Sequence, residues 1–271
     1  MSLRVRMLLA ALLLIVLPVC ACASMPELHG YDKNEQEYIY VTFGRYPTGK
    51  NGEVEPVIWR ILGTGMPGEG DIINQSNLPP KGYKKIPNVD TISEENADVY
   101  CLMTQSIIDV LLYHPTRDEQ DGPALDYVDS LIYDTLNTDV ISTLFTAEEQ
   151  AVLVPMPERG LLGLPSRKGE LYALEYGFAN EDFCKSVRRS ARGTPYAYAK
   201  GLKRVAGNSW YWTTDWRAPG RRWIVGDDGH ISVSGVNREG GVRPICYVHM
   251  NRLTCSGGTG TLENPYVLSA P

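Results

Sequence analysis

The sequence has few of the residues and spacings on which catalysis and metal binding usually depend. It contains no C-x-x-C pair, so a structural zinc site has no support. It also lacks the G-x-S-x-G motif, and none of its four histidines lies in a recognised nucleophile motif. We therefore assign no catalytic residue and no metal ligand, and we expect no cofactor.

A long hydrophobic run occurs only at the start of the chain. Arg4 and Arg6 precede an almost wholly apolar stretch at 7–19, and small residues follow at 21–24. This order is typical of a secretory signal peptide, and the run is shorter than the roughly 20 residues that span a bilayer. We predict a leader at residues 1–23, followed by an exported, soluble chain.

Two processing routes fit the end of this leader. Ala21-Cys22-Ala23 matches the small-x-small pattern of ordinary signal peptidase sites, whereas Val19-Cys20-Ala21-Cys22 resembles a bacterial lipobox. We favour lipidation at Cys22, because the two cysteines otherwise have no purpose. The chain is then expected at the cell envelope or outside the cell, attached to the membrane only through the lipid, with a tether at residues 24–37.

Acidic residues outnumber basic ones, 32 to 26, but unevenly along the chain. Residues 22–150 hold 8 basic and 22 acidic residues, whereas residues 151–271 hold 16 and 10. Either the two parts compensate each other's charge, or the second presents a basic surface to an anionic ligand. An acidic, exported chain without a recognised nucleic-acid motif is not expected to bind nucleic acid. The basic surface would comprise Arg188, Arg189, Arg192, Lys200, Lys203, Arg204, Arg217, Arg221 and Arg222.

Phenylalanine is scarce, with four residues against 16 tyrosines and five tryptophans. Tyrosine and tryptophan suit binding surfaces, but they also pack in β-rich cores when their polar tips are satisfied. Trp210 and Trp212 alternate along an expected strand and so share one face. We favour core packing for this face over a stacking platform for sugar rings. Arg243 is expected within an apolar strand, flanked by Pro244. We favour a structural residue bonded to a carboxylate or to backbone carbonyls over a ligand contact. The candidate ligand-binding residues are Trp210, Trp212, Trp216, Trp223, Arg222 and Arg243.

Four cysteines follow the leader, at positions 101, 184, 246 and 255. An exported protein can oxidise such cysteines, and four of them allow three pairings. Cys246 and Cys255 lie close enough in sequence to close a short loop, and they are the candidate disulfide.

Apolar runs bounded by turn residues predict short strands on both sides of a helical region. Asp228-Gly229 predicts a tight turn between two of these strands. Residues 63–98 are predicted to form an irregular loop because they are rich in glycine, proline and asparagine. A short helix is predicted at 171–178. The predicted strands are 38–43, 56–62, 100–103, 210–214, 223–225, 231–233 and an edge strand at 265–268.

The helical region lies at 128–145, where apolar residues recur at spacings of three and four. Thr146 and Glu149 follow it with the spacing of a capping box, in which each residue satisfies the other's amide. The sequence therefore predicts that two helices meet near residue 146.

Several short motifs occur in an order that resembles an uncharacterised family of exported bacterial domains, over residues 38–268. The family's W-W-L-R-S block is replaced by Trp210-Tyr211-Trp212-Thr213-Thr214, so the function of its arginine and serine is not carried over. The matching segments are Phe43-Gly44-Arg45-Tyr46-Pro47, Pro56-Val57-Ile58-Trp59-Arg60-Ile61-Leu62, Ser130, Leu136-Asn137, Phe145-Thr146, Glu149, Thr194-Pro195-Tyr196-Ala197, Gly241-Val242-Arg243-Pro244, Gly258-Thr259-Gly260-Thr261 and Asn264-Pro265-Tyr266.

The W…G…G-V-R-P ending is also similar to the C-type lectin-like fold shared with formylglycine-generating enzymes. This resemblance implies one α+β domain over residues 38–271, with two or three helices and short twisted antiparallel sheets. The E-P-N and W-N-D triplets of calcium-dependent lectins are absent, and Glu263-Asn264-Pro265 has another order. A calcium site is therefore not expected.

The leading hypothesis is a noncatalytic binding module for a carbohydrate or an envelope protein at the bacterial cell surface. One alternative is an oxidase of the formylglycine-generating type, in which Cys246 and Cys255 are the soft ligands of a copper ion. Another is a structural envelope protein. Fold resemblance alone does not choose between them.

Overall fold

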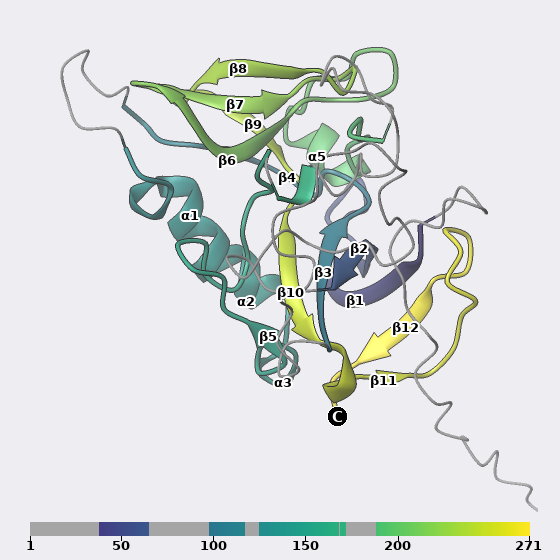
Figure 1. The fold of residues 1–271 in the computed structure, drawn as a ribbon. Helices are drawn as coiled ribbons and strands as arrows, with labels where there is room; N and C mark the ends of the chain where they lie inside the picture. Colours follow the sequence, from purple (N-terminus) through teal and green to yellow (C-terminus); the bar gives the residue numbers. More distant parts are fainter. Residues whose placement is uncertain (1–37, 65–97, 117–124, 168, 172–187) are drawn as a thin grey trace, which may run out of the picture.

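The structure is a computed structural model that describes residues 38–64, 98–116, 125–167, 169–171 and 188–271. Within these ranges the chain is α+β, with two curled β-sheets and a few short helices (Figure 1). The predicted leader and tether lie outside the described residues. So do almost all of the loop and of the short helix predicted at 63–98 and 171–178.

The larger sheet has seven strands in the order β11-β12-β1-β2-β3-β10-β5. Its neighbours are antiparallel except that β12 runs parallel to β1, which places the first and last described strands side by side (Figure 1). The strands are β1 (Tyr40–Pro47), β2 (Val54–Thr64), β3 (Val99–Thr104), β5 (Leu153–Val154), β10 (Ile245–His249), β11 (Thr254–Cys255) and β12 (Tyr266–Ser269).

The smaller sheet has five strands in the order β4-β9-β6-β7-β8. The predicted Asp228-Gly229 turn is confirmed: it joins antiparallel strands β7 and β8, and Gly229 takes a positive φ of 78°. Strand β6 pairs with β9 in parallel at Tyr211 and Gly241. The strands are β4 (Asp109–Leu112), β6 (Tyr211–Ala218), β7 (Arg221–Val225), β8 (Ile231–Gly235) and β9 (Glu239–Val242).

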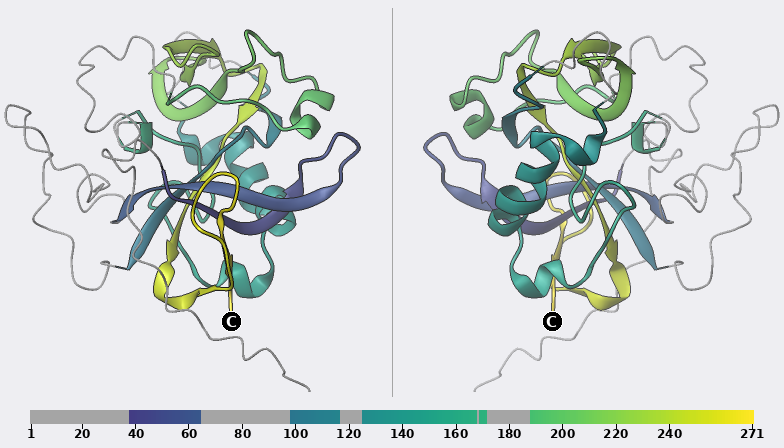
Figure 2. Two further views of the ribbon diagram at one scale, coloured as in Figure 1. Left: turned by 90° about the vertical axis from the view of Figure 1, so that its right-hand side faces the viewer. Right: turned by 90° about the vertical axis from the view of Figure 1, so that its left-hand side faces the viewer.

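The predicted helical stripe is confirmed as a nearly continuous run over residues 131–144, in which η4 is a π-helical turn. The run lies across one face of the strands (Figure 2, right). The apolar side chains of Ile132, Leu136, Val140, Ile141 and Leu144 on this run are buried. The helices are η3 (Tyr127–Asp129), α1 (Leu131–Thr135), η4 (Leu136–Val140), α2 (Ile141–Leu144), α3 (Ala147–Gln150), α5 (Pro195–Ala199) and η5 (Met250–Arg252).

The capping box at the start of α3 is also confirmed. The Thr146 hydroxyl accepts a hydrogen bond from the Glu149 amide at 3.2 Å, and the Glu149 carboxylate accepts one from the Thr146 amide at 2.9 Å. In the described part of the chain, no helix is long and apolar enough to cross a membrane.

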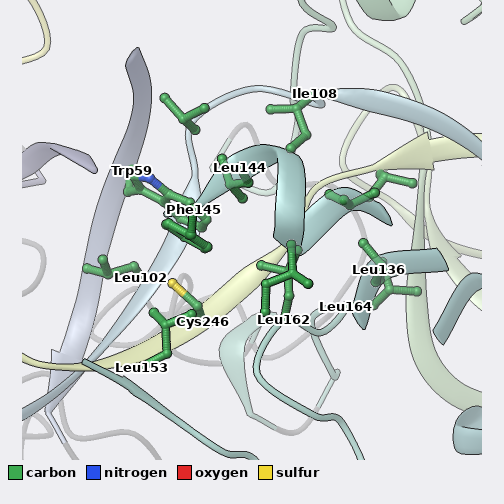
Figure 3. Packing of buried hydrophobic residues seen from close by; sticks show 14 of the residues in the cluster. Trp59, Leu102, Ile108, Leu136, Leu144, Phe145, Leu153, Leu162, Leu164 and Cys246 are labelled. Atoms are coloured by element: carbon green, nitrogen blue, oxygen red, sulfur yellow. The ribbon is translucent and has the colours of Figure 1, made fainter. Parts of the chain in front are cut away.

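The main hydrophobic core lies between this helical run and the larger sheet (Figure 3). The Trp59 ring stacks on Phe145 with centroids 6.0 Å apart, and its indole N–H donates to the Phe43 carbonyl at 2.7 Å. Gly44 is required beside this pair: its φ is +68°, and a Cβ there would lie 2.7 Å from the Phe145 ring. The Phe43-Gly44 motif therefore records close packing between β1 and the helical run.

Three expectations about the strands were wrong. Both sheets are mixed rather than purely antiparallel, because β12 and β6 each have one parallel neighbour. Strand β12 is not an edge strand, since β11 pairs with its outer side. Arg243 lies between β9 and β10 rather than within a strand, because Pro244 interrupts the run.

Candidate ligand-binding site

Trp210 and Trp212 do share one face, but that face points into the molecule. Their rings meet edge to face at 4.9 Å, and Trp212 is 0% exposed against Tyr113 at 5.0 Å. A Cβ at Gly240 would lie 2.2 Å from the Trp210 ring, so the glycine admits this packing. The structure therefore supports core packing, the interpretation that the sequence favours, because β4 and β9 cover Trp212 and part of Trp210. The alternative, in which these two candidate residues form a platform for a ligand, is not supported.

Arg243 is likewise a structural residue rather than a surface contact. Its side chain is 0% exposed. Its Nε donates to the Thr104 carbonyl at 2.8 Å, and its Nη1 donates to the Arg189 carbonyl and the Tyr211 hydroxyl, each at 3.2 Å. Of the two readings of Arg243, bonding to backbone carbonyls is the one that the structure supports.

Trp216 and Arg222 behave differently, because they line one pocket of about 530 Å³. The pairing of β6 with β7 shifts register after Trp212, and from Thr214 onward the strand leaves the core. Trp216 is consequently 50% exposed. Tyr127 lines the pocket from η3 and Asp126 from the position just before it, and Glu158 and Arg159 line it from the loop after β5.

Arg222 brings an unneutralised charge to this pocket. Its side chain is 2% exposed, its guanidinium lies 5.3 Å from the centroid of the Tyr113 ring, and its Nη2 donates to the Leu125 carbonyl. Among the described residues, its Nε has no hydrogen-bond partner and its guanidinium forms no ion pair with a carboxylate. A buried guanidinium with an unused donor favours a ligand that carries hydrogen-bond acceptors or negative charge.

Asn137 fixes the loop after β5, which carries the pocket residues Glu158 and Arg159. Its carboxamide oxygen accepts from the amides of Leu161 and Leu162 at 3.0 and 3.2 Å. Its Nδ2 donates to the Arg159 and Leu162 carbonyls at 3.4 and 3.0 Å. Asn137 lies in the π-helical turn η4, and such turns often mark functional sites. Gly160 completes this arrangement, since a Cβ there would lie 2.2 Å from the Asn137 side chain.

A buried ion pair between Arg159 and Glu170 also holds this loop in place. Arg159 Nη1 and Glu170 Oε1 are 2.8 Å apart, and Glu170 also accepts from the Tyr247 hydroxyl at 3.0 Å and the Ser166 amide at 2.7 Å. Burial alone raises the pKa of Glu170, but the charge of Arg159 and the Ser166 amide outweigh it. The net result is a pKa of Glu170 below its ordinary value.

Trp223 lies beside this site without lining it. Its ring is flanked by two guanidiniums, that of Arg167 at 4.3 Å and that of Arg217 at 5.3 Å. Asp215 accepts from the Arg167 amide at 2.7 Å, and burial raises the pKa of Asp215 above its ordinary value. Trp223 thus packs against Arg167 and Arg217, and it is not among the residues that line the pocket with Trp216.

The cysteines supply neither a disulfide nor a metal site in the described residues. Cys246 and Cys255 are free thiols, so the predicted disulfide between them is not present. Cys246 is buried among Leu102, Leu153 and their neighbours (Figure 3), and burial raises the pKa of its thiol. Cys255 lies partly exposed near the edge of the sheet. The described residues hold no cluster of three or more metal-ligating side chains.

Sequence reasoning missed most of the pocket. Trp216 and Arg222 were among the candidates, whereas Asp126, Glu158 and Arg159 were not. The composition of Pro157-Glu158-Arg159-Gly160 is that of a turn, which could have marked the loop. No local pattern connects that loop with β6, because only the folded chain brings them together.

Comparison of the chain with protein-family models, with curated proteins and with solved structures finds no match. The function therefore has to be argued from the site.

Proposed function

We propose that this protein is an exported, lipid-anchored, noncatalytic binding module that binds a carbohydrate in the pocket lined by Trp216 and Arg222. Export and anchoring rest on the leader at residues 1–23 and on Cys22 as the lipidated residue. An envelope protein is the other ligand class that this kind of site could take.

The observation that carries the proposal is the combination of groups in one pocket. Its volume of about 530 Å³ lies within the ~300–1,000 Å³ of small-molecule sites. The half-exposed Trp216 offers an aromatic face to the apolar face of a sugar ring. Asp126 and Glu158 offer carboxylate oxygens to hydroxyl groups, and Arg222 offers donors to ring or carboxylate oxygens.

The charged side chains around the pocket restrict the kind of sugar that it can bind. Arg159 is neutralised by Glu170, whereas Arg222 has no carboxylate partner among the described residues. The carboxylates of Asp126, just before η3, and of Glu158, in the loop after β5, are exposed. We expect a neutral sugar or one that carries a carboxylate, because a buried guanidinium binds such a group with two parallel hydrogen bonds.

We also propose that the chain belongs to the exported bacterial family and has a C-type lectin-like fold. The motifs from Phe43-Gly44 to Gly241-Val242-Arg243-Pro244 support membership of the exported bacterial family, and the α+β build is compatible with a C-type lectin-like domain. The oxidase alternative has less support, because Cys246 is enclosed in the hydrophobic core where neither copper nor a substrate has access.

The test is a titration of the full-length chain with a panel of neutral and uronate-containing oligosaccharides, by isothermal calorimetry. We expect Trp216→Ala to weaken binding at least tenfold and Trp216→Phe to retain most of it. Val205→Ala is the control, since Val205 is similarly exposed but does not line the pocket. Equal affinities of all three variants would place the ligand elsewhere. Failure of every sugar together with capture of an envelope protein through Trp216 would replace the carbohydrate with a protein partner.

A further inference from the structure

A second, smaller pocket of about 210 Å³ lies on another part of the molecule. It is formed where the segment 190–192 passes between residues 105–106 and Asn208. Backbone bonds fix these walls: the Ile107 amide donates to the Arg192 carbonyl at 2.9 Å, and the Ser209 amide donates to the Ala191 carbonyl at 2.9 Å. The pocket shares no lining residue with the Trp216 pocket.

Arg60 forms the inner wall of this pocket. It projects from β2 and is 9% exposed. Its Nε donates to the Gln105 side-chain oxygen, its Nη1 donates to the Arg188 carbonyl at 3.1 Å, and its guanidinium lies 5.0 Å from the Tyr38 ring centroid. All of these partners are neutral groups, and no ion pair between Arg60 and a carboxylate occurs within the described residues.

Arg243 adds a second buried positive charge behind Arg60. Arg60 pairs with Met103 across the sheet, and Arg243 bonds to the adjacent Thr104 carbonyl. Arg243 also lacks a carboxylate partner among the described residues, and its Nη2 has no hydrogen-bond partner. Burial is the largest cause that lowers the pKa of Arg243; the Tyr211 hydroxyl opposes it, and the charge of Arg60 lowers the pKa further.

Two neighbouring guanidiniums buried without a counter-charge are costly, because desolvation and mutual repulsion add. An anion bound beside them would offset both. The rest of the lining suits an oxyanion: Ser106 and Asn208 are polar, and Gln105 keeps its amide N–H₂ for a ligand since its oxygen already accepts from Arg60. Arg192, which is exposed, brings a further guanidinium to the mouth.

We propose that this pocket binds one phosphate or sulfate group between Arg60 and Arg192, with Arg243 as the supporting charge behind it. The volume of about 210 Å³ is below the ~300 Å³ of the smallest drug-sized sites, which favours a single oxyanion group. The group belongs either to a free anion or to an anionic polymer. Arg192 and Arg243 belong to the basic part at residues 151–271, whereas Arg60 comes from β2 in the acidic part.

The experiment measures thermal unfolding of the full-length chain against increasing sodium phosphate and sodium sulfate, with sodium chloride at matched ionic strength. We expect a saturable rise in melting temperature with the oxyanions and none with chloride. Arg192→Gln should weaken the apparent affinity at least tenfold. Arg252→Gln is the matched control, since Arg252 is an exposed arginine in η5, beyond the other end of β10, and should respond as the unaltered chain does.

A second arm separates the sources of the oxyanion. Dextran sulfate binding more tightly than free sulfate, with the same dependence on Arg192, would assign the site to a polymer; equal or weaker binding would assign it to the free ion. A rise that does not saturate, or that is the same in Arg192→Gln, reflects general salt stabilisation and overturns the proposal. Arg60→Lys is examined next, because it keeps the charge but removes the fork and should reduce affinity without removing it.

Discussion

Strand β6 has two halves that use the same residue type for opposite purposes. In the first half, Trp212 is fully enclosed by Tyr113 and Trp210. Four residues later, Trp216 is 50% exposed and lines a pocket. The register shift between them turns the strand out of the core. Alternation along a strand therefore sets which side chains share a face, whereas the neighbouring elements decide whether that face is covered.

The largest loss of stability is expected when the buried ring of Trp212 is truncated. We expect Trp212→Ala to lower the free energy of unfolding by about 3–5 kcal/mol, because the cavity removes contacts with Tyr113 and Trp210. Chemical denaturation followed by circular dichroism measures it. A loss below about 1 kcal/mol would mean that Trp212 is not a core residue.

The second effect concerns the ion pair beneath the pocket loop. Glu170→Gln should cost about 3 kcal/mol, because it leaves the Arg159 charge buried without a counter-charge. The folded-state pKa of Glu170 is lowered, so its stabilisation is fully present above the ordinary glutamate pKa of about 4.3 and is lost as the pH falls through the folded pKa.

The measurement is the difference in unfolding free energy between the unaltered chain and Glu170→Gln, from pH 7 down to pH 3. That difference should shrink as the pH falls below about 4.3. A difference that stays constant over this range would show that the Glu170 charge does not contribute to stability.

A smaller loss of stability is expected when Asn137, which holds the pocket loop after β5, is truncated. Asn137→Ala should lower the free energy of unfolding by about 2 kcal/mol, because it leaves loop amides and carbonyls without partners. It should also weaken carbohydrate binding, since the loop carries Glu158. Thr138→Ala is the control: its hydroxyl bonds only the Asp134 carbonyl within the helical run. Equal effects of the two variants would contradict a positioning role.

The smallest effect on stability is expected when the exposed ring of Trp216 is truncated. Trp216→Ala should change the free energy of unfolding by less than about 0.5 kcal/mol, because the ring is half exposed and outside the core. The same denaturation experiment measures it beside Trp212→Ala. A cost near that of Trp212→Ala would show that Trp216 is a packing residue and would weaken the case for a site.

Local sequence signals predicted the elements well but not their assembly. Periodicity located the helical run, Thr146 and Glu149 marked a helix start, and Asp228-Gly229 marked a hairpin, because each signal depends on neighbours in the chain. The burial of Trp212, the parallel pairing of β12 and the joining of Glu158 with Trp216 depend on residues far apart in sequence. Nothing local encodes such contacts, so the pocket could be predicted only in part.

The pairing of β12 with β1 also has a consequence for how the chain folds. The Thr42 hydroxyl bonds to the Tyr266 carbonyl, 224 residues away, and the Tyr40 amide bonds to the Gly260 carbonyl at 2.8 Å. The larger sheet therefore cannot be completed until residues 260–269 have been synthesised. Contacts of such separation slow folding, because the long loop between the two ends has to close before these strands can pair.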